Sequence, residues 1–580
     1  MDETRAQAYL QLIETLLNGP NGEKQQILQA NLELVDSGFL EVCEVVAENL
    51  ADEGQENPAN FLRNLASQLG QFLGMNDEGD SDNSEGENSQ EYAKFILDLL
   101  QAEKDSQSDI KVIYPMLAGR QHLLNDRFAK ILQEVVQKLI AEHPEAIEFI
   151  LDRIGSLSIH INDFPLGKKA NNIEIAITGY QIVLNNREPG SENWTQTQNN
   201  LAIAYTYRIR GEKAQNIESA IASYTAALTV FTRDAFPEKW ASTQNNLAIA
   251  YTYRIRGKKA QNIESAIASY TAALTVLTRD AFPEKWAQTQ NNLAIAYTYR
   301  IRGEKAQNIE SAIASYTAAL TVYTRDAFPQ DWAATQNNLA IAYSYRIRGE
   351  KAENIELAIA YYTAALSVRT RDAFPEYWAS TQNNLGEAYR NRIRGETAEN
   401  IELAIAYYTA ALTVYTSDAF PQDWAQTQNN LAIAYTYRIR GETAENIELA
   451  IAYYTATLTI RTRDAFPENW AQTQNNLAIA YSYRIRGEKA ENIELAIASC
   501  TAALTIYTRD AFPENWARTQ NNLAAAYSDR IRGEKAENIE LAIASYTAAL
   551  TVYTRDAFPE NWASTQNNLA NAYCDRIRGE

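Results

Sequence analysis

The stretch WASTQNNLAIAYTYRIRG, residues 240–257, decides the fold because close copies of it recur at a fixed spacing along the chain. Every tryptophan of the protein begins such a copy, and successive tryptophans lie 46 residues apart. A fixed period of this length is the signature of a repeat architecture, in which each unit packs against its neighbours. The nine tryptophans are Trp194, Trp240, Trp286, Trp332, Trp378, Trp424, Trp470, Trp516 and Trp562.

Each unit predicts two helices and no strand. Helix A is expected from the tryptophan to YRIR, and the glycine that follows is a natural stop. Helix B is expected to begin near ENIELAI, with Asn as N-cap and Glu in the first turn, and to continue through ASYTAALTVYT. The proline of RDAFP is expected to end the unit. The predicted fold class is therefore all-α: a right-handed α-solenoid of antiparallel helix pairs, preceded by a small N-terminal helical region.

The chain is expected to contain five parts. Residues 1–75 predict short amphipathic helices, and residues 92–143 predict a second small helical region. Between them, residues 76–91 are acidic and lack apolar anchors, which predicts a disordered linker. Residues 144–193 form an imperfect copy of the unit and are expected to cap the stack. Residues 194–580 hold nine repeats, the last of them incomplete.

A helical wheel separates two faces of helix A. At 100° per residue from Trp194, the residues Leu201 and Tyr205 join the tryptophan in one buried stripe. Asn199, Ile203 and Tyr207 fall on the opposite face. When A helices stack side by side, that second face becomes a continuous wall.

The repeat resembles the tetratricopeptide repeat in residues such as Leu201, Ala202, Tyr205 and Ala220. The stretch TQNNLAIAY also resembles the repeats of kinesin light chains, whose asparagines line a concave peptide-binding groove. Over its full length, the chain is similar to cyanobacterial tetratricopeptide proteins, many of which continue into a caspase-like CHAT domain. The resemblance implies a non-enzymatic scaffold that binds a peptide or protein partner in a concave groove. It also implies an alternative, the sensor arm of a CHAT-type protease whose catalytic domain is absent here.

The first asparagine of each NN pair is the main candidate for the groove. Its amide offers a donor and an acceptor to the backbone of a bound segment. In the alternative, the asparagines bond a neighbouring helix and hold the stack in register. The predicted groove residues are Asn199, Asn245, Asn291, Asn337, Asn383, Asn429, Asn475, Asn521, Asn567, Ile203, Tyr207, Ile249, Tyr253, Ile295, Tyr299, Glu387, Arg390 and Asn391.

The fifth full copy departs from the others on the predicted groove face. Glu387, Arg390 and Asn391 stand where six other copies have Ile, Thr or Ser, and Tyr, whereas the eighth and ninth copies carry other substitutions at these positions. A charge pair among apolar neighbours marks one location on a repetitive wall, so it is a candidate for fixing the register of a bound segment. In the alternative, Glu387 and Arg390 merely pair with each other on the helix surface.

Charge and residue types favour a binding protein over an enzyme. Residues 1–165 hold 30 acidic and 11 basic side chains, and the remainder is close to neutral, which argues against nucleic-acid binding. Cys43, Cys500 and Cys574 are far apart and odd in number, which favours a reducing compartment and a cytoplasmic location. Neither they nor the three histidines have metal-ligand spacing. We expect no catalytic residue, cofactor, metal or membrane partner.

Two further expectations concern the repeat edges. The Arg-Ile-Arg of each unit, for example Arg254 and Arg256, is expected to close helix A at the negative end of its dipole, or to pair with the aspartate of RDAFP. The sequence ends after a helix A without its helix B. Because a solenoid normally ends in a polar cap, the uncapped last repeat is a candidate for end-to-end self-association.

Overall fold

The structure is a computed structural model that describes residues 3–18, single positions between 31 and 66, and residues 81–579. The chain divides into two compact units. The N-terminal unit comprises Met1–His160 and Phe164–Gly167, and the repeat stack comprises Ile161–Asp163 and Lys168–Glu580. The described residues form helices and no strand, as the sequence predicts.

The N-terminal unit contains helices of unequal length. Helix α1 lies within the region predicted to form short helices, and most other residues before residue 75 lie outside the described residues. Helix α5 begins at Ser81, inside the stretch predicted as a linker. The described elements are α1 (Glu3–Asn18), α5 (Ser81–Asp105), α6 (Ile110–Gly119), η2 (Gln121–Leu123), α7 (Asp126–Glu142), η3 (Pro144–Ala146) and α8 (Ile147–Asp163).

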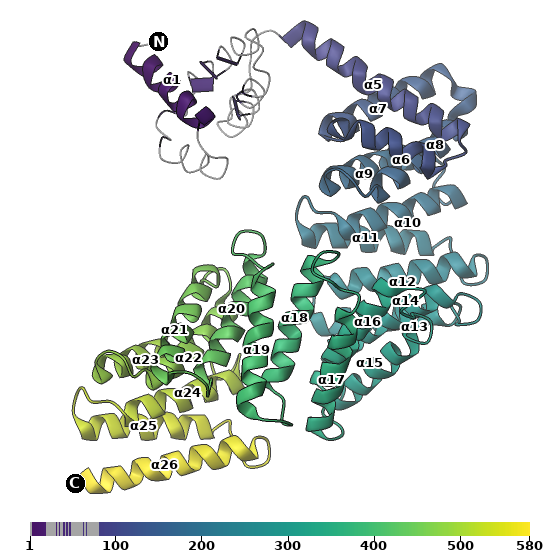
Figure 1. Cartoon of the computed structure of the whole chain (residues 1–580). Helices are drawn as coiled ribbons and strands as arrows, with labels where there is room; N and C mark the ends of the chain where they lie inside the picture. The colour runs from purple at the N-terminus through teal and green to yellow at the C-terminus, as the bar shows by residue number, and fades with distance from the viewer. Residues whose placement is uncertain are drawn as a thin grey trace. The chain divides into compact units, whose positions relative to one another are not determined.

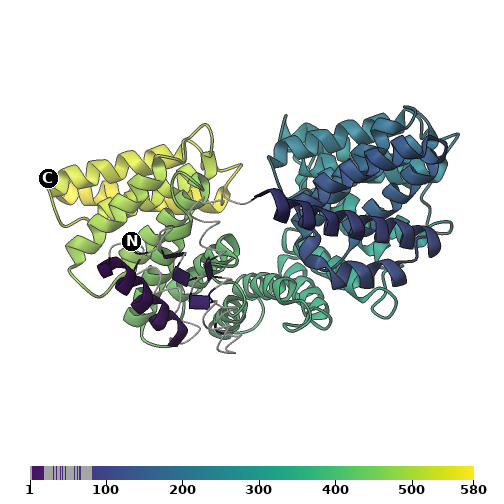
Figure 2. The ribbon, with the colours of Figure 1, turned by 90° about the horizontal axis from the view of Figure 1, so that it is seen from above.

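The repeat stack is a series of helix pairs that follow one another along the chain (Figures 1 and 2). The A helices are α10 (Glu192–Tyr207), α12 (Pro237–Tyr253), α14 (Pro283–Thr298), α16 (Pro329–Ser344), α18 (Pro375–Arg390), α20 (Pro421–Thr436), α22 (Pro467–Tyr483), α24 (Pro513–Ser528) and α26 (Pro559–Gly579). The B helices are α11 (Lys213–Leu228), α13 (Lys259–Leu274), α15 (Lys305–Ala319), α17 (Lys351–Leu366), α19 (Thr397–Leu412), α21 (Thr443–Ile460), α23 (Lys489–Leu504) and α25 (Lys535–Leu550). Helix α9 (Lys169–Asn186) precedes them and matches helix B of the imperfect copy.

Helix A begins earlier than the sequence suggested. The proline of RDAFP does not end a unit: in α12, Pro237 is the first helical residue and Phe236 is the N-cap. Proline is well suited to this position because its missing N–H would have no partner there. At the other end, Arg254 is already the C-cap, so the Arg-Ile-Arg segment lies in the connection between helices.

The predicted N-cap of helix B is wrong. Helix α13 begins at Lys259, and Asn262 lies one turn inside it with 3% of its surface exposed. Its side-chain amide donates to the carbonyl of Arg256 at 2.9 Å and to that of Arg254 at 3.1 Å. Gly257 has a φ of +82°, which favours glycine over other residues. The asparagine therefore fastens the RIRG connection to helix B.

Each B helix is buried between two A helices. Ile263, Ala266 and Tyr270 of α13 pack with Ala248 of the same unit and with Leu293 of the next unit. The equivalent residues form such a cluster in the following units. Burial of these side chains between successive units explains why one copy alone lacks a complete core.

The tryptophans belong to a second set of clusters at the other end of the helices. Trp286 is partly buried against Ala287, Ala319 and Tyr323. This packing joins the start of one A helix to the end of the B helix in its own unit. Trp286 thus contributes to the packing between the two helices of its unit.

Ion pairs connect successive units. Arg254 donates from Nε and Nη2 to both carboxylate oxygens of Glu218 in the preceding B helix, at 2.8 Å each. The first arginine of RIR thus forms a bidentate ion pair with a glutamate, and not the predicted pair with the aspartate of RDAFP. The equivalent pairs are Arg208–Glu174, Arg300–Glu264, Arg346–Glu310, Arg392–Glu356, Arg438–Glu402, Arg484–Glu448, Arg530–Glu494 and Arg576–Glu540.

Candidate functional site

The candidate site is the face of the A helices that lies away from their own B helices. Successive A helices are in contact with one another, for example α12 with α14 and α18 with α20, whereas the B helices pack chiefly on A helices. This face carries a column of tyrosines that are each more than half exposed at the end of helix A. The column comprises Tyr207, Tyr253, Tyr299, Tyr345, Tyr437 and Tyr483.

A cleft of about 620 Å³ opens across three consecutive units, between the ends of the A helices and the B helices α15 and α17. Of the predicted site residues, it brings together Tyr299 directly after α14, Glu387 from α18 and Asn391 directly after α18. Ile341 from α16 and Tyr345 directly after it also line the cleft. The remaining lining residues are Thr298, Lys305, Ile309, Ser344, Lys351, Ile355, Tyr362, Asn384 and Ala388.

In most units, the side chain of the first asparagine of the NN pair forms a hydrogen bond to the next A helix. Asn199 is 9% exposed, and its carbonyl oxygen accepts a hydrogen bond from Thr243 of the next A helix at 3.2 Å. The same bond joins Thr335 to Asn291, Thr381 to Asn337, Thr473 to Asn429 and Thr565 to Asn521. A groove role for this column stays a prediction, and the geometry favours the alternative in which it holds the units in register.

Two asparagines of the column bond the second asparagine of the next unit instead. Asn383 accepts from Asn430 at 3.2 Å, and Asn475 accepts from Asn522 at 3.0 Å. The second asparagine of the NN pair reaches the cleft in the fifth unit. Asn384 lines the cleft, whereas Asn383, the first asparagine of the same pair, does not. Asn199 lines a different, smaller cleft of about 280 Å³ together with Lys239.

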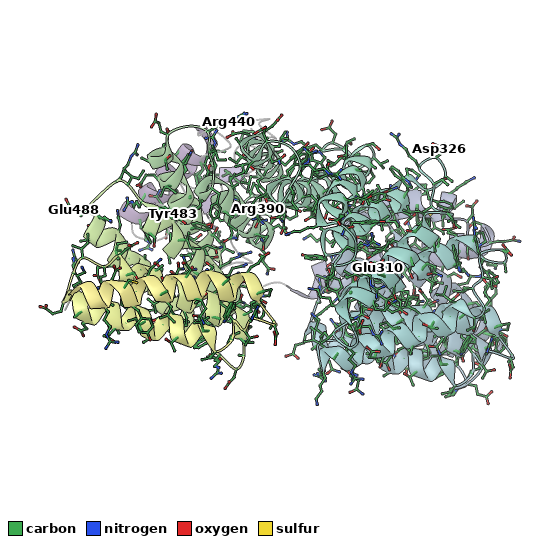
Figure 3. All side chains as sticks on the ribbon, turned by 90° about the horizontal axis from the view of Figure 1, so that it is seen from below. Glu310, Asp326, Arg390, Arg440, Tyr483 and Glu488 are labelled. Carbon is green, nitrogen blue, oxygen red and sulfur yellow. The ribbon has the colours of Figure 1, made fainter. Side chains whose placement is uncertain are left out.

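The fifth unit has a local arrangement of its own. In other copies a Thr or Ser of helix A lies near the hydroxyl of a buried helix-B tyrosine, as Thr206 lies 3.5 Å from Tyr224. In the fifth unit Arg390 replaces that residue beside Tyr408, whose phenol pKa is raised by burial and lowered in part by the Arg390 guanidinium. Arg390 is labelled in Figure 3 together with Tyr483.

Glu387 lies on the cleft side of this arrangement. Its carboxylate is 3.8 Å from the Arg390 guanidinium, and 47% of its side chain is exposed. The pKa of the Tyr345 phenol is raised by burial and then by the charge of Glu387. The carboxylate thus lies close to the exposed tyrosine of the preceding unit.

Gly386 makes room for the buried tyrosine of the fifth unit. A Cβ atom at Gly386 would lie 2.8 Å from Cε1 of Tyr408, although the equivalent residue in other copies is alanine. The Tyr408 ring is therefore closer to helix A here than a common repeat would allow. Gly386 and Tyr408 belong to the buried core between α18 and α19 and do not line the cleft.

Gly386→Ala is expected to destabilise α18 and α19 by about 1–3 kcal/mol, the usual cost of overpacking a core. Gly386→Ala combined with Arg390→Thr should recover much of that loss, because Tyr408 then regains the threonine neighbour of the common repeat. Hydrogen exchange of the two helices measures both variants. Equal protection in Gly386→Ala and the unchanged chain would show that the close approach is unimportant.

Sequence reasoning missed Lys305 and Lys351 as cleft residues. The two lysines begin helices α15 and α17, and a helical wheel of helix A alone does not include them. A signal was present in the repeat itself. Lysine occupies this position in the first four units, whereas Thr397 and Thr443 occupy it in the next two.

One cysteine and one histidine of the described residues lie in buried or paired surroundings. Cys500 is buried in a core cluster in place of a tyrosine, and burial raises the pKa of its thiol to about 12. His160 lies 2.7 Å from Glu103 in the N-terminal unit. Over residues 3–18 and 81–579 and the single positions between them, we find no cluster of three or more acidic, histidine or cysteine side chains that could hold a metal ion. In the same part of the chain, every helix is too short or too polar to cross a bilayer.

No protein-family model matches the sequence, and no curated protein matches it. Solved structures of repeat proteins match weakly. Cut9–Hcn1 of the APC/C is 15% identical, with 83% of this chain and 96% of that chain covered and a TM-score of 0.35. Yeast Tom70 is 13% identical, with 92% and 96% covered and a TM-score of 0.34. The C-terminal part of a TPR repeat-containing protein from Cytophaga hutchinsonii is 15% identical, with 54% and 96% covered and a TM-score of 0.31.

The class of the protein is defined by its own helices: a repeated A–B pair in which each B helix is buried between two A helices. The chain is an all-α solenoid of tetratricopeptide-like repeats.

Proposed function

We propose that the repeat stack is a scaffold that binds an extended or helical segment of a partner protein on the face of its A helices. The observation that carries this proposal is the cleft lined by Tyr299, Tyr345, Glu387 and Asn391. Residues of three units converge there, and the two tyrosines are 57% and 56% exposed. Amphipathic aromatic side chains with one apolar and one polar end are favoured at protein interfaces.

The form of the face also supports a protein segment over a small molecule. The cleft continues on both sides into a column of exposed tyrosines. Such a repeated set of partly exposed side chains suits a partner that extends over several units. The first-column asparagines contribute to this function by fixing the spacing of the units.

Tyr299→Ala combined with Tyr345→Ala is expected to weaken partner binding about tenfold or more, because truncating a central interface tyrosine commonly costs over 1 kcal/mol. The partner would be isolated by cross-linking to the full chain and its affinity measured by calorimetry. Tyr377→Ala is the matched control, since Tyr377 is 56% exposed and lies outside this cleft. If the control weakens binding as much as the double variant, the cleft is not the binding site.

A further inference from the structure

Charge along the cleft changes sign between the fourth and fifth units. Lys305 and Lys351 line it from the third and fourth units, and both side chains are exposed. Neither lysine has an ion-pair partner among the described side chains. In the fifth and sixth units Thr397 and Thr443 replace the lysine, so the row of lysines is interrupted after Lys351 and resumes at Lys489.

The negative charge appears where the lysines end. Glu387 replaces the isoleucine of the common repeat in the fifth unit and lines the same cleft. Its intramolecular partner Arg390 is 3.8 Å away and also faces Tyr408, so the carboxylate is weakly engaged. Pairs of this kind on a helix surface contribute little to stability, and the Glu387 charge is therefore available to a ligand.

We infer that the cleft recognises a partner segment that carries two acidic side chains followed by one basic side chain. The acidic side chains would meet Lys305 and Lys351, and the basic one would meet Glu387 beside Tyr345. This inference rests on the proposed function and names the chemistry of the partner. Among nearly identical repeats, such a change of sign fixes the register and direction of the bound chain.

The spacing of the units sets the spacing of these side chains. Packed helices lie about 8–10 Å apart, and an extended chain advances about 3.3 Å per residue. One unit thus corresponds to about three residues of an extended segment. The expected ligand has acidic residues at two positions three apart and a basic residue three positions further, read in one of the two chain directions.

Four synthetic peptides of nine residues test this prediction against the full chain by fluorescence anisotropy. All have an alanine and leucine background. Two place two glutamates and one lysine at the expected spacing, in opposite directions along the peptide. The third carries three glutamates and the fourth carries three lysines. One mixed peptide is expected to bind at least about tenfold more tightly than both single-sign peptides, since complementary charges set specificity.

Variants of the chain then assign the charges. Lys305→Thr with Lys351→Thr introduces the residue of the fifth and sixth units. This double variant should lower the affinity for the preferred mixed peptide about tenfold. Lys489→Thr with Lys535→Thr makes the same change in the seventh and eighth units, outside the cleft, and should leave affinity unchanged. Glu387→Lys should reverse the preference, so that the three-glutamate peptide binds more tightly than the mixed one.

The outcomes separate this inference from the proposed function. A single-sign peptide that binds the unchanged chain as well as either mixed peptide overturns the inference, as does an unaltered preference in Glu387→Lys. If no peptide binds while capture of the natural partner still depends on Tyr299 and Tyr345, the charge pattern is rejected and the groove function stands. If partner capture is independent of those tyrosines, the proposed function itself fails.

Discussion

Acidification from pH 7 to about pH 3.5 is expected to destabilise the repeat stack strongly, because the same ion pair joins every pair of units. The arginine hydrogen bonds hold the pKa of the glutamate below its ordinary value in seven of these pairs. A carboxyl group whose pKa is lowered by folding contributes stability that is complete above the unfolded pKa, about 4.3, and is lost as the pH falls through the folded pKa. The glutamates are Glu218, Glu264, Glu310, Glu356, Glu402, Glu448 and Glu494.

Urea unfolding followed by circular dichroism at several pH values measures this effect. The midpoint should be nearly constant from pH 7 to pH 5 and fall steeply below about pH 4.5. Glu310→Gln provides the control: it should lower the midpoint at pH 7 and reduce the further loss on acidification, because one titrating group is gone. Equal midpoints at pH 7 and pH 3.5 in the unchanged chain would show that the ion pairs do not stabilise the stack.

The sequence predicted the fold because its information is periodic. A 46-residue period with one tryptophan per unit and apolar residues at helical spacing requires two helices that bury a shared face. Leu201 of the predicted stripe does lie in the core, whereas Tyr205 is partly buried. The error was confined to the helix ends, where Pro237 starts a helix and Asn262 lies inside one.

These errors have a common physical origin. Proline and asparagine each have two roles near a helix end, and the local sequence does not distinguish them. Asn262 resembles an N-cap, but its partners are the carbonyls of Arg254 and Arg256, which a fold must first bring back to it. The chain reversal at Gly257 creates that contact.

The candidate site was predicted in part. A helical wheel places Asn199 and Tyr207 on the side of helix A away from the first buried stripe, yet it ignores the neighbouring A helix. Thr243 of that neighbour engages Asn199, whereas Tyr207 at the helix end stays exposed. The lysines of the cleft come from helix B and required the packed structure. The direction of a side chain could be predicted, and its partners across units could not.

Asn354→Ala is expected to lower the free energy of unfolding around the fourth unit by about 2–3 kcal/mol, since the partners of a buried amide lose their hydrogen bonds. Asn354 is 3% exposed and donates to the carbonyls of Arg348 at 2.9 Å and Arg346 at 3.4 Å. Its own carbonyl oxygen accepts from Nη1 of Arg346 at 3.4 Å, the same arginine that pairs with Glu310. Loss of this side chain therefore loosens both the connection and the ion pair between units.

Asn384→Ala is the matched control, because Asn384 is half-buried and its side chain makes no hydrogen bond within the described residues. It should change stability by less than about 0.5 kcal/mol. Hydrogen exchange read helix by helix distinguishes the two variants. In a solenoid each unit is coupled to its neighbours, so Asn354→Ala should raise exchange in α16, α17 and the adjoining helices and leave α22 to α25 unchanged. Exchange that rises equally throughout the stack, or equally in both variants, would show that this asparagine does not hold the junction.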